Sequence, residues 1–313
     1  MNGRAVCIER LAVIGVGLIG GSLARSLKQA GAVAHVTGIG RDAAHLERAR
    51  ALGVVDEATT SLAEGVARAD VVAVCVPMGA YDAVFRALAE AASETAVITD
   101  AGSTKRHALQ AARRHLDAGR LARFVPAHPI AGGERSGVEA SRADLFAGHW
   151  CVLTPTGQTA EDATALVEAM WRATGARVTT MDAGDHDAFL AAVSHLPHLA
   201  AYALVNAVRK QGDEAHDPFR FAAGGFRDFT RIASSSPVMW RDIALANRDA
   251  LLAQLAAYRD ELESLKAALE AGDGEALLSA FSAAKKARDD WLARKDGDQG
   301  RTVCDGIKDG GDE

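Results

Sequence analysis

The sequence predicts two domains, an α/β domain with a parallel sheet followed by an all-helical domain. Up to Met181, short Val- and Ile-rich runs alternate with amphipathic stretches, as in a parallel sheet with helices on both faces. Beyond that point the strand signals stop and only helical stretches follow. The length of 313 residues suits about two domains. We therefore expect an α/β domain over 1–181, an all-α domain over 182–295 and a disordered, Gly- and acid-rich tail over 296–313.

The expected strands are short apolar runs that lie next to turn-forming residues. They are Leu11–Gly15, Val36–Gly40, Val71–Val76, Ala96–Asp100, Arg123–Ala127, Trp150–Thr154 and Arg177–Met181, and we expect the later ones to pair antiparallel at one edge. Helical periodicity between the earlier runs covers Ser22–Ala30, Ala43–Leu52 and Tyr81–Ala92. In the second domain it covers His186–Arg209, Phe219–Ile232, Pro237–Asn247, Asp249–Leu269 and Glu275–Leu292.

Composition excludes several classes of protein. The net charge is −6 and no block of basic residues occurs, so a nucleic-acid partner is not expected. No apolar stretch in Met1–Arg10 has the form of a signal peptide. The cysteines are far apart, which argues against a disulfide framework or a zinc site and suits a reducing cytoplasm: Cys7, Cys75, Cys151 and Cys304. We expect a cytoplasmic protein without a metal.

One stretch, Ala188–Val208, carries no formal charge and is long enough to cross a bilayer. It is interrupted mid-length by polar residues and a proline, so we interpret it as a buried core helix or a dimer helix and expect no membrane partner.

The N-terminal end carries the pattern of a dinucleotide site. In "RLAVIGVGLIGGSLARSLKQAG", Gly15, Gly17 and Gly20 have G-x-G-x-x-G spacing between an apolar strand and a helix that opens with Leu18 and Ile19. This is the Rossmann-type context, in which the glycines allow a tight turn, close approach of a pyrophosphate and helix–strand packing. The alternative is a glycine turn without a ligand.

Two further positions extend the expected cofactor site. Val76 ends the expected strand Val71–Val76 and Pro77 follows it, so both belong to the same edge of the sheet. Arg41 stands at the end of the second strand, where an NAD enzyme usually has an acid for the ribose hydroxyl. Because arginine can pair with a 2′-phosphate, we favour NADP, with NAD as the alternative.

The carboxyl ends of the fourth and fifth strands carry polar residues. "VITDAGSTKR" places Asp100, Ser103 and Lys105 at the edge where ligands bind in open α/β sheets. "FVPAHPIAGGERSG" brings His128 to the same edge, followed by glycines that leave room for a molecule. His128 is a candidate proton acceptor near neutral pH, although a lone histidine there could also be structural.

Five motifs together resemble the prephenate dehydrogenase / arogenate dehydrogenase (TyrA-type) family. They are "GVGLIGGS", "DAGSTK", "HPIAGGERSG", "SHLPH" and "GGFRDFTRIASSSPVMWRDI", and the resemblance runs from about Arg10 to Ala293. It implies a Rossmann-type dinucleotide-binding domain followed by a helical domain that dimerises, so the partners expected are a small-molecule substrate and a second copy of the chain. A departure is Ala101, where family members often have glutamine.

The resemblance also implies roles for individual residues. His128 would take the proton from the substrate's ring hydroxyl, and Ser103 would orient that histidine or hydroxyl near the nicotinamide. Arg231 would bind a substrate carboxylate. Residues expected in contact with the substrate or beside Arg231 are Ser194, His195, His198, Glu134, Asp228 and Thr230. From the residues alone, His195 and His198 could instead be structural, and Arg231 could be an ion-pair partner of Asp228.

The function expected is oxidative decarboxylation of prephenate to 4-hydroxyphenylpyruvate, with hydride transfer to NAD(P) in tyrosine biosynthesis. The first alternative is arogenate as substrate. Another is a dehydrogenase of the β-hydroxyacid or phosphogluconate kind, but those use a lysine in a Gly-rich helix, and "AGGFRDFTRIA" has none. The last is a dinucleotide-binding sensor without turnover.

Overall fold

The computed structural model describes residues 8–133, 135–212 and 217–304. Its main sheet has six parallel strands in the order β3-β2-β1-β4-β5-β6. This is the doubly wound order of dinucleotide-binding domains, so the predicted Rossmann-type fold is confirmed. The strands are β1 (Ile8–Ile14), β2 (Val33–Ile39), β3 (Glu57–Thr59), β4 (Val71–Val74), β5 (Val97–Asp100) and β6 (Phe124–Val125).

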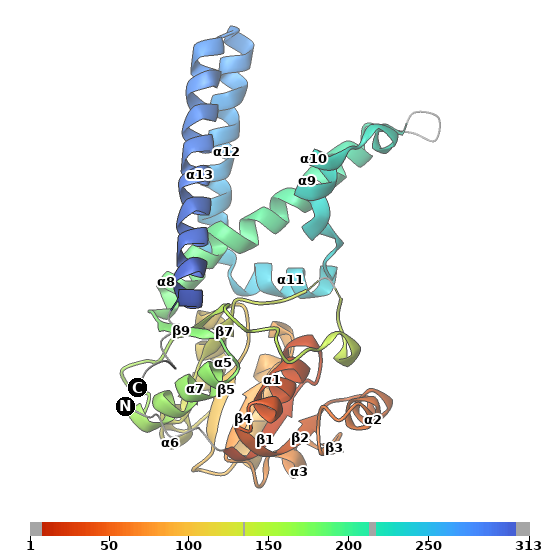
Figure 1. Cartoon of the computed structure of the whole chain (residues 1–313), viewed down its shortest axis with the longest axis vertical. Helices are drawn as coiled ribbons and strands as arrows, with labels where there is room; N and C mark the ends of the chain where they lie inside the picture. Colours follow the sequence, from red (N-terminus) through yellow and green to blue (C-terminus); the bar gives the residue numbers. More distant parts are fainter. Residues whose placement is uncertain (1–7, 134, 213–216, 305–313) are drawn as a thin grey trace, which may run out of the picture. The chain divides into compact units, whose positions relative to one another are not determined.

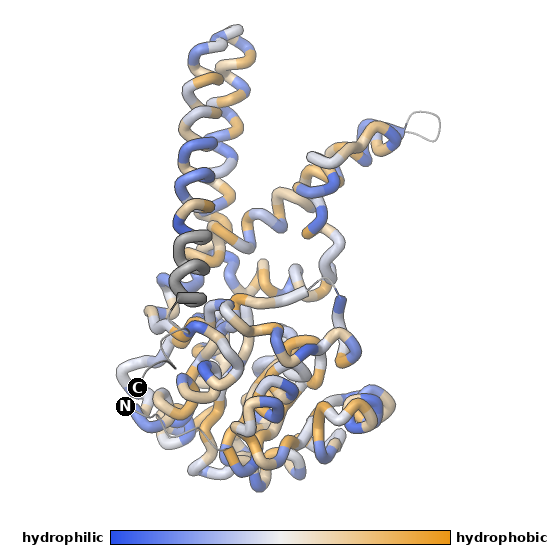
Figure 2. The backbone as a smooth tube through the Cα atoms, in the orientation of Figure 1, coloured by the Kyte–Doolittle hydropathy of each residue, from blue (hydrophilic) through white to orange (hydrophobic). Residues whose placement is uncertain are grey.

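Helices cover both faces of this sheet (Figure 1). Successive residues of β1 point to opposite faces, so Leu11 and Val13 belong to one apolar cluster and Ala12 and Ile14 to the other. Figure 2 shows the strands as predominantly apolar, as expected for strands buried on both faces. The helices are α1 (Leu18–Gln29), α2 (Ala43–Ala51), α3 (Leu62–Val66), α4 (Tyr81–Ala91) after the turn η1 (Met78–Ala80), α5 (Lys105–His115) and α6 (Ala118–Ala122).

The later strands form a second sheet of three strands, which differs from the expected antiparallel edge. The strands are β7 (Ala127–Pro129), β8 (Trp150–Leu153) and β9 (Arg177–Thr180), and only β7–β8 is antiparallel. The expected single run Arg123–Ala127 divides at Pro126, which has no N–H to donate to a ladder. The next N–H, of Ala127, donates to the Asp100 carboxylate at 3.0 Å. η2 (Val138–Ala140) and α7 (Glu161–Ala173) lie between these strands in the chain.

The expected helix His186–Arg209 contains an irregular turn. α8 (Ala183–Leu190) continues into η3 (Ala191–His195), one π-helical turn, and then into α9 (Leu196–Arg209). Pro197 lies just after this turn, and a proline inside a helix removes one hydrogen bond and crowds the carbonyl four residues earlier. The wider π turn accommodates that conflict. The chain continues through η4 (Pro218–Phe221), α10 (Gly224–Thr230), η5 (Arg231–Ser234) and α11 (Pro237–Ala246).

The stretch Ala183–Arg209 is long and apolar enough to cross a membrane, judged by length and composition only, and 17% of its most apolar window is buried inside the chain. The prediction of a core helix is therefore wrong for the single chain. Val193 is 73% exposed and Phe189 is 58% exposed. The dimer-helix alternative is compatible with such exposure.

The chain packs as two compact units, Met1–Leu252 and Ala253–Glu313. α12 (Arg248–Ala271) and α13 (Gly274–Cys304) form a helical hairpin, and Gly272 makes its turn with a φ of +65°. α13 extends to Cys304, into the segment 296–313 expected to be disordered. Adding a residue to a formed helix fixes little extra chain per hydrogen bond, so polar residues can continue it. Residues 305–313 lie outside the described part.

Candidate active site

The glycine loop between β1 and α1 has the geometry that a dinucleotide needs. Gly15 has a φ of +94°, and a Cβ there would lie 2.5 Å from the Cys75 carbonyl oxygen. A Cβ on Gly20 would lie 2.2 Å from the Gly15 carbonyl oxygen, so this helix and loop pack at glycine distance. Gly17 has no atom within 4 Å of a Cβ position, and no side chain caps α1. The first N–H groups of α1 are therefore available to an anion.

The end of β2 carries the residues expected to contact the adenosine ribose. Arg41 is exposed there, while the Asp42 carboxylate caps α2 by accepting the N–H groups of Ala44 and His45 at 2.9 and 3.2 Å. Asp42 is thus engaged in its own helix. Val76 and Pro77 follow β4 on the other side of the loop, and Val76 Cγ1 would lie 3.0 Å from a Cβ on Gly15.

His128 lies in β7 at the head of a chain of polar side chains. Its Nδ1 is 2.8 Å from His186 Nε2, and His186 Nδ1 is 2.8 Å from the Asp187 carboxylate. Both His186 and Asp187 are buried and lie in α8. Neither residue belongs to a motif that could be recognised in the sequence. The only local signal was the "DHD" triplet at the start of a helix.

Asp187 has a second role, because it caps a helix other than its own. Its two carboxylate oxygens accept the N–H groups of Lys105 and Arg106 at 2.7 and 3.0 Å. These are the first residues of α5, and Thr104 before them makes no side-chain cap. A carboxylate at a helix N-terminus is stabilised by the free N–H groups and the helix dipole.

The hydrogen-bond order fixes the protons along this chain. Asp187 can only accept, so His186 carries its proton on Nδ1 and accepts through Nε2. His128 then donates from Nδ1, which leaves a lone pair on its Nε2. This assignment follows from the network, since hydrogen positions are inferred from partners. His128 is thereby held as the tautomer that can accept a proton.

The electrostatics keep this chain neutral at its histidines. Burial lowers the pKa of His128 well below its usual range, and nearby His186 and Lys105 lower it further. Burial also lowers the pKa of His186, partly offset by its bond to Asp187. Burial alone would raise the pKa of Asp187, but hydrogen bonds from His186 and from the α5 N–H groups lower it. The carboxylate is therefore charged and the two histidines are neutral at neutral pH.

A buried ion pair holds the residue before His128. Lys105 Nζ lies 2.5 Å from Asp100 Oδ2 and 2.5 Å from the Ala127 carbonyl oxygen, and both side chains are 0% exposed. Asp100 also accepts the Ala127 N–H at 3.0 Å and the Tyr81 hydroxyl at 2.8 Å. Both backbone polar groups of Ala127 are therefore fixed. Ser103 lies between β5 and α5 in the same turn, two residues before Lys105.

A cavity of about 740 Å³ connects the cofactor end to the helical part. Leu18 from the start of α1 lines it together with His198 and Arg231, which come from α9 and η5. The segment after His128 contributes Gly132, Gly133 and Arg135. A residue expected to contact the cofactor and two residues expected to contact the substrate thus line one cavity. Among the described residues, neither His128 nor Ser103 lines it.

His198 is held by its neighbours on two sides. Its ring stacks on Trp240 with a centroid distance of 3.5 Å, and its Nδ1 lies 2.9 Å from the carbonyl oxygen of Ser194. A carbonyl accepts, so Nδ1 donates and Nε2 keeps a lone pair. Burial lowers the pKa of His198. Ser194 is half-buried one turn earlier.

Three residues expected near the substrate or Arg231 have partners within the protein. His195 is 1% exposed, with Nδ1 at 3.0 Å from Asn247 Nδ2, so one of its ring nitrogens is engaged in the protein. The π turn that ends at His195 sets this direction. Asp228 is exposed and pairs with Arg227 at 3.4 Å, and the Thr230 hydroxyl donates to the Phe226 carbonyl at 2.7 Å. Asp228 and Thr230 are therefore bonded to other residues of α10. Glu134 lies outside the described residues.

The doubly wound sheet, the open glycine loop and the cavity beside it define a dinucleotide-dependent dehydrogenase. Comparisons narrow the class. The family model for the nucleotide-binding domain of prephenate dehydrogenase matches residues 23–180. The model for the prephenate dehydrogenase dimerization domain matches residues 182–283. The chain belongs to the prephenate dehydrogenase family and is an oxidoreductase of the prephenate/arogenate type that binds NAD(P).

Individual relatives agree over nearly the whole chain. A cyclohexadienyl dehydrogenase of Zymomonas mobilis is 38% identical over 281 residues, covering 90% of this chain and 95% of that protein. Prephenate dehydrogenase from A. aeolicus, solved with hydroxyphenyl propionate and NAD+, has a TM-score of 0.86 and 33% identity and covers 92% of this chain and 99% of its own. Synechocystis arogenate dehydrogenase has a TM-score of 0.75 and 28% identity, with 90% and 99% covered.

Proposed function

We propose that this protein oxidises and decarboxylates prephenate to 4-hydroxyphenylpyruvate, with NADP as hydride acceptor, in tyrosine biosynthesis. The observation that carries the proposal is the chain His128–His186–Asp187, which leaves a lone pair on His128 Nε2 in β7. The relatives support the substrate class, because they include prephenate, cyclohexadienyl and arogenate dehydrogenases.

The proposed chemistry uses His128 twice. Bound NADP supplies the hydride acceptor. As hydride leaves the hydroxyl-bearing ring carbon, His128 Nε2 accepts the hydroxyl proton and a ring ketone forms. The ring carboxylate then leaves as carbon dioxide, and its bonding electrons pass through the ring to the ketone oxygen. That oxygen takes the proton back from His128, which restores the neutral histidine. The lowered pKa of His128 favours this return.

The residues around His128 act as positioning groups. His186 and Asp187 fix its tautomer and stabilise the positive charge that it carries transiently. Lys105 and Asp100 fix the backbone at Ala127, so the ring is presented from a rigid strand end. Ser103, in the turn below, is proposed to contact the substrate hydroxyl or His128.

The helical wall of the 740 Å³ cavity is proposed to hold the substrate's carboxylates. Arg231 lines that cavity and would form charge-assisted hydrogen bonds with a carboxylate. His198 lies in the same lining, and Ser194 lies one turn before it. Glu134 keeps its proposed place near the mouth of the pocket on the family motif alone.

The choice of NADP over NAD rests on the end of β2. Arg41 is exposed there, and the acid next to it caps α2. The test is Arg41→Asp: we expect the preference for NADP over NAD, measured as the ratio of kcat/KM values, to fall by about tenfold or more as a charge-assisted contact is lost. A wild-type enzyme that already prefers NAD by more than about tenfold would contradict the assignment.

The domain boundary and the assembly are part of the proposal. We infer a dinucleotide-binding domain over 1–181 and a helical domain over 182–295 that forms a homodimer, in a cytoplasmic enzyme. The exposed apolar residues of α8 to α9 support a dimer contact, as does the dimerization-domain match. Light scattering at micromolar concentration should give the mass of two chains, and a monomer mass would contradict it.

Steady-state kinetics test the function. Reduction of NADP and of NAD is followed with prephenate and with arogenate in parallel. We expect the largest kcat/KM for prephenate with NADP. The two molecules differ only at the side-chain keto or amino group. A larger kcat/KM for arogenate would therefore show that arogenate, and not prephenate, is the preferred substrate. No turnover with either substrate would refute the proposed function and favour a non-catalytic dinucleotide sensor.

A further inference from the structure

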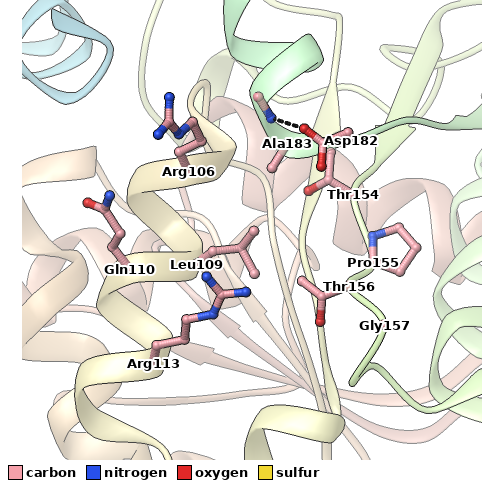
Figure 3. Close-up of a pocket in the computed structure, with 11 residues that line it drawn as sticks. Arg106, Leu109, Gln110, Arg113, Thr154, Pro155, Thr156, Gly157, Asp182 and Ala183 are labelled. Carbon is pink, nitrogen blue, oxygen red and sulfur yellow. Dashed lines mark hydrogen bonds between the residues drawn. The ribbon is translucent and has the colours of Figure 1, made fainter. Parts of the chain in front are cut away.

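A second cavity, of about 510 Å³, lies between α5 and the segment after β8. Its volume is in the range of small-molecule sites. It shares no lining residue with the 740 Å³ cavity. Figure 3 shows α5 on one side, with the chain from Thr154 to Gly157 and the start of α8 on the other. The lining residues are Arg106, Leu109, Gln110, Arg113, Thr154, Pro155, Thr156, Gly157, Asp182, Ala183 and Gly184.

The charge of this cavity favours an anion. Arg106 and Arg113 are seven residues apart on α5, or about 10 Å along the helix. Within the described parts of the chain, neither guanidinium group has an ion pair or hydrogen bond, whereas adjacent Arg114 pairs with Asp82. The one acid in the lining, Asp182, caps α8 by accepting the Gly184 N–H at 2.6 Å. In Figure 3 the Arg113 guanidinium lies on the side of α5 that faces Thr156, whereas the Arg106 guanidinium points away from that wall.

The remaining lining suits a molecule with a short apolar body. Leu109 lies on α5 between the two arginines, and Pro155 belongs to the opposite wall. Gln110 and Thr156 add polar groups. The Thr154 hydroxyl is buried at the wall and has no hydrogen-bond partner among the described residues, although buried hydroxyls are usually satisfied.

The cavity also adjoins the chain that holds His128. Its wall at Asp182, Ala183 and Gly184 is the first turn of α8, which carries His186 and Asp187. From the other wall, the Arg106 N–H donates to Asp187 at 3.0 Å. A molecule bound to the two arginines and to this turn would therefore contact both helices that Asp187 joins.

We propose that this cavity binds a small carboxylic acid with an apolar body, and that its occupancy changes the rate of proton transfer at His128. The guanidinium of Arg113 forms the main contact with the carboxylate, and Arg106, in the first turn of α5, adds a second positive charge to the lining. The binding half is independent of the proposed function, and the rate half rests on it.

Isothermal titration calorimetry of the full chain with benzoate, and separately with succinate, tests the binding half. We expect Arg113→Gln to weaken binding by about tenfold or more, the effect of losing a charge-assisted contact, and Arg106→Gln to weaken it less. Two controls should leave affinity unchanged: Arg86→Gln, an exposed arginine on α4, and Arg231→Ala in the other cavity. Binding by neither acid, or binding lost in Arg231→Ala and kept in Arg113→Gln, would overturn the site.

Kinetics at saturating benzoate or succinate test the rate half. We expect kcat with the preferred substrate to change at least twofold in the wild type while KM for the cofactor stays constant, and we expect no change in Arg113→Gln. Binding without any change in kcat would overturn the rate half and leave the site. If the enzyme shows no turnover even when neither benzoate nor succinate is present, the proposed function is refuted. The calorimetric result on binding would remain valid in that case.

Discussion

The charged groups that hold His128 in place are buried, whereas the charged groups next to Arg231 are exposed. Beneath His128, Lys105 and Asp100 are 0% exposed, and Asp187 is bonded to two helices. Around Arg231, the neighbouring Asp228 has a side chain 74% exposed and pairs with the adjacent Arg227. Long side chains in water lose contacts readily, whereas a buried charge cannot lose its partner cheaply. If the proposed roles hold, the proton acceptor rests on a buried, fixed network, while the residue proposed to bind the substrate lies beside exposed charges.

The largest effect should follow from His128→Asn. Asparagine keeps a polar side chain but cannot accept the proton, so we expect kcat to fall by roughly 10²- to 10⁴-fold. Cofactor affinity should stay within twofold, because the glycine loop is unaffected. Stopped-flow hydride transfer and cofactor titration give the two quantities. Activity within twofold of wild type would remove His128 from the mechanism.

Breaking the buried pair should rank next. Lys105→Met leaves Asp100 buried without its partner, which typically costs about 3–5 kcal/mol of unfolding free energy. Lys28→Met is the matched control, since Lys28 pairs with Asp56 at 2.6 Å but both are about one-third exposed. That control should lose less than about 1 kcal/mol. Urea unfolding of both variants tests the contrast, and equal losses would show that burial of the pair does not matter.

Local patterns in the sequence were sufficient for most of the fold, but not for these supports. Glycine spacing and apolar runs predicted the parallel sheet and its cofactor edge. β3 (Glu57–Thr59) was missed because its burial pattern has no fully buried residue. Asp187 was missed because its partner Lys105 is 82 residues away, and no local pattern records that contact. The direction of the His195 side chain could not be read from helical periodicity, because the extra residue in a π turn changes which face a side chain occupies.

A further buried group, His195, predicts that stability depends on pH. Burial lowers the pKa of His195 from its usual 6.5 to about 4. Because the pKa of His195 is lower in the folded protein, the unfolded chain takes up the proton at a higher pH than the folded chain does. The free energy of unfolding is therefore unaffected by protonation of His195 above about pH 6.5 and decreases as pH falls toward 4. The full loss is on the order of 3 kcal/mol. In His195→Gln, unfolding free energy should fall less between pH 6.5 and 4 than in wild type; parallel curves would contradict the assignment.

The exposed side should give the smallest change. Arg231→Ala should raise KM by about ten- to hundredfold, because one charge-assisted contact is lost, while kcat changes less. Arg231→Lys should recover part of the affinity, since lysine keeps the charge but not the planar fork. Melting temperatures should match wild type. If both variants melt earlier and KM is unchanged, Arg231 is a structural residue and the substrate is bound elsewhere.

The π turn at Ala191–His195 sets the rotational phase of everything after it on α9. Each residue of an α-helix advances the side-chain direction by about 100°, so one residue gained or lost in this turn would rotate His198 by more than a quarter of a circle. It would also swing the exposed apolar face of α9 around its axis. A single-residue deletion here would therefore rotate all of α9 about its axis. It would disturb the cavity lining and the exposed apolar face together, although the sequence of every later residue would be unchanged.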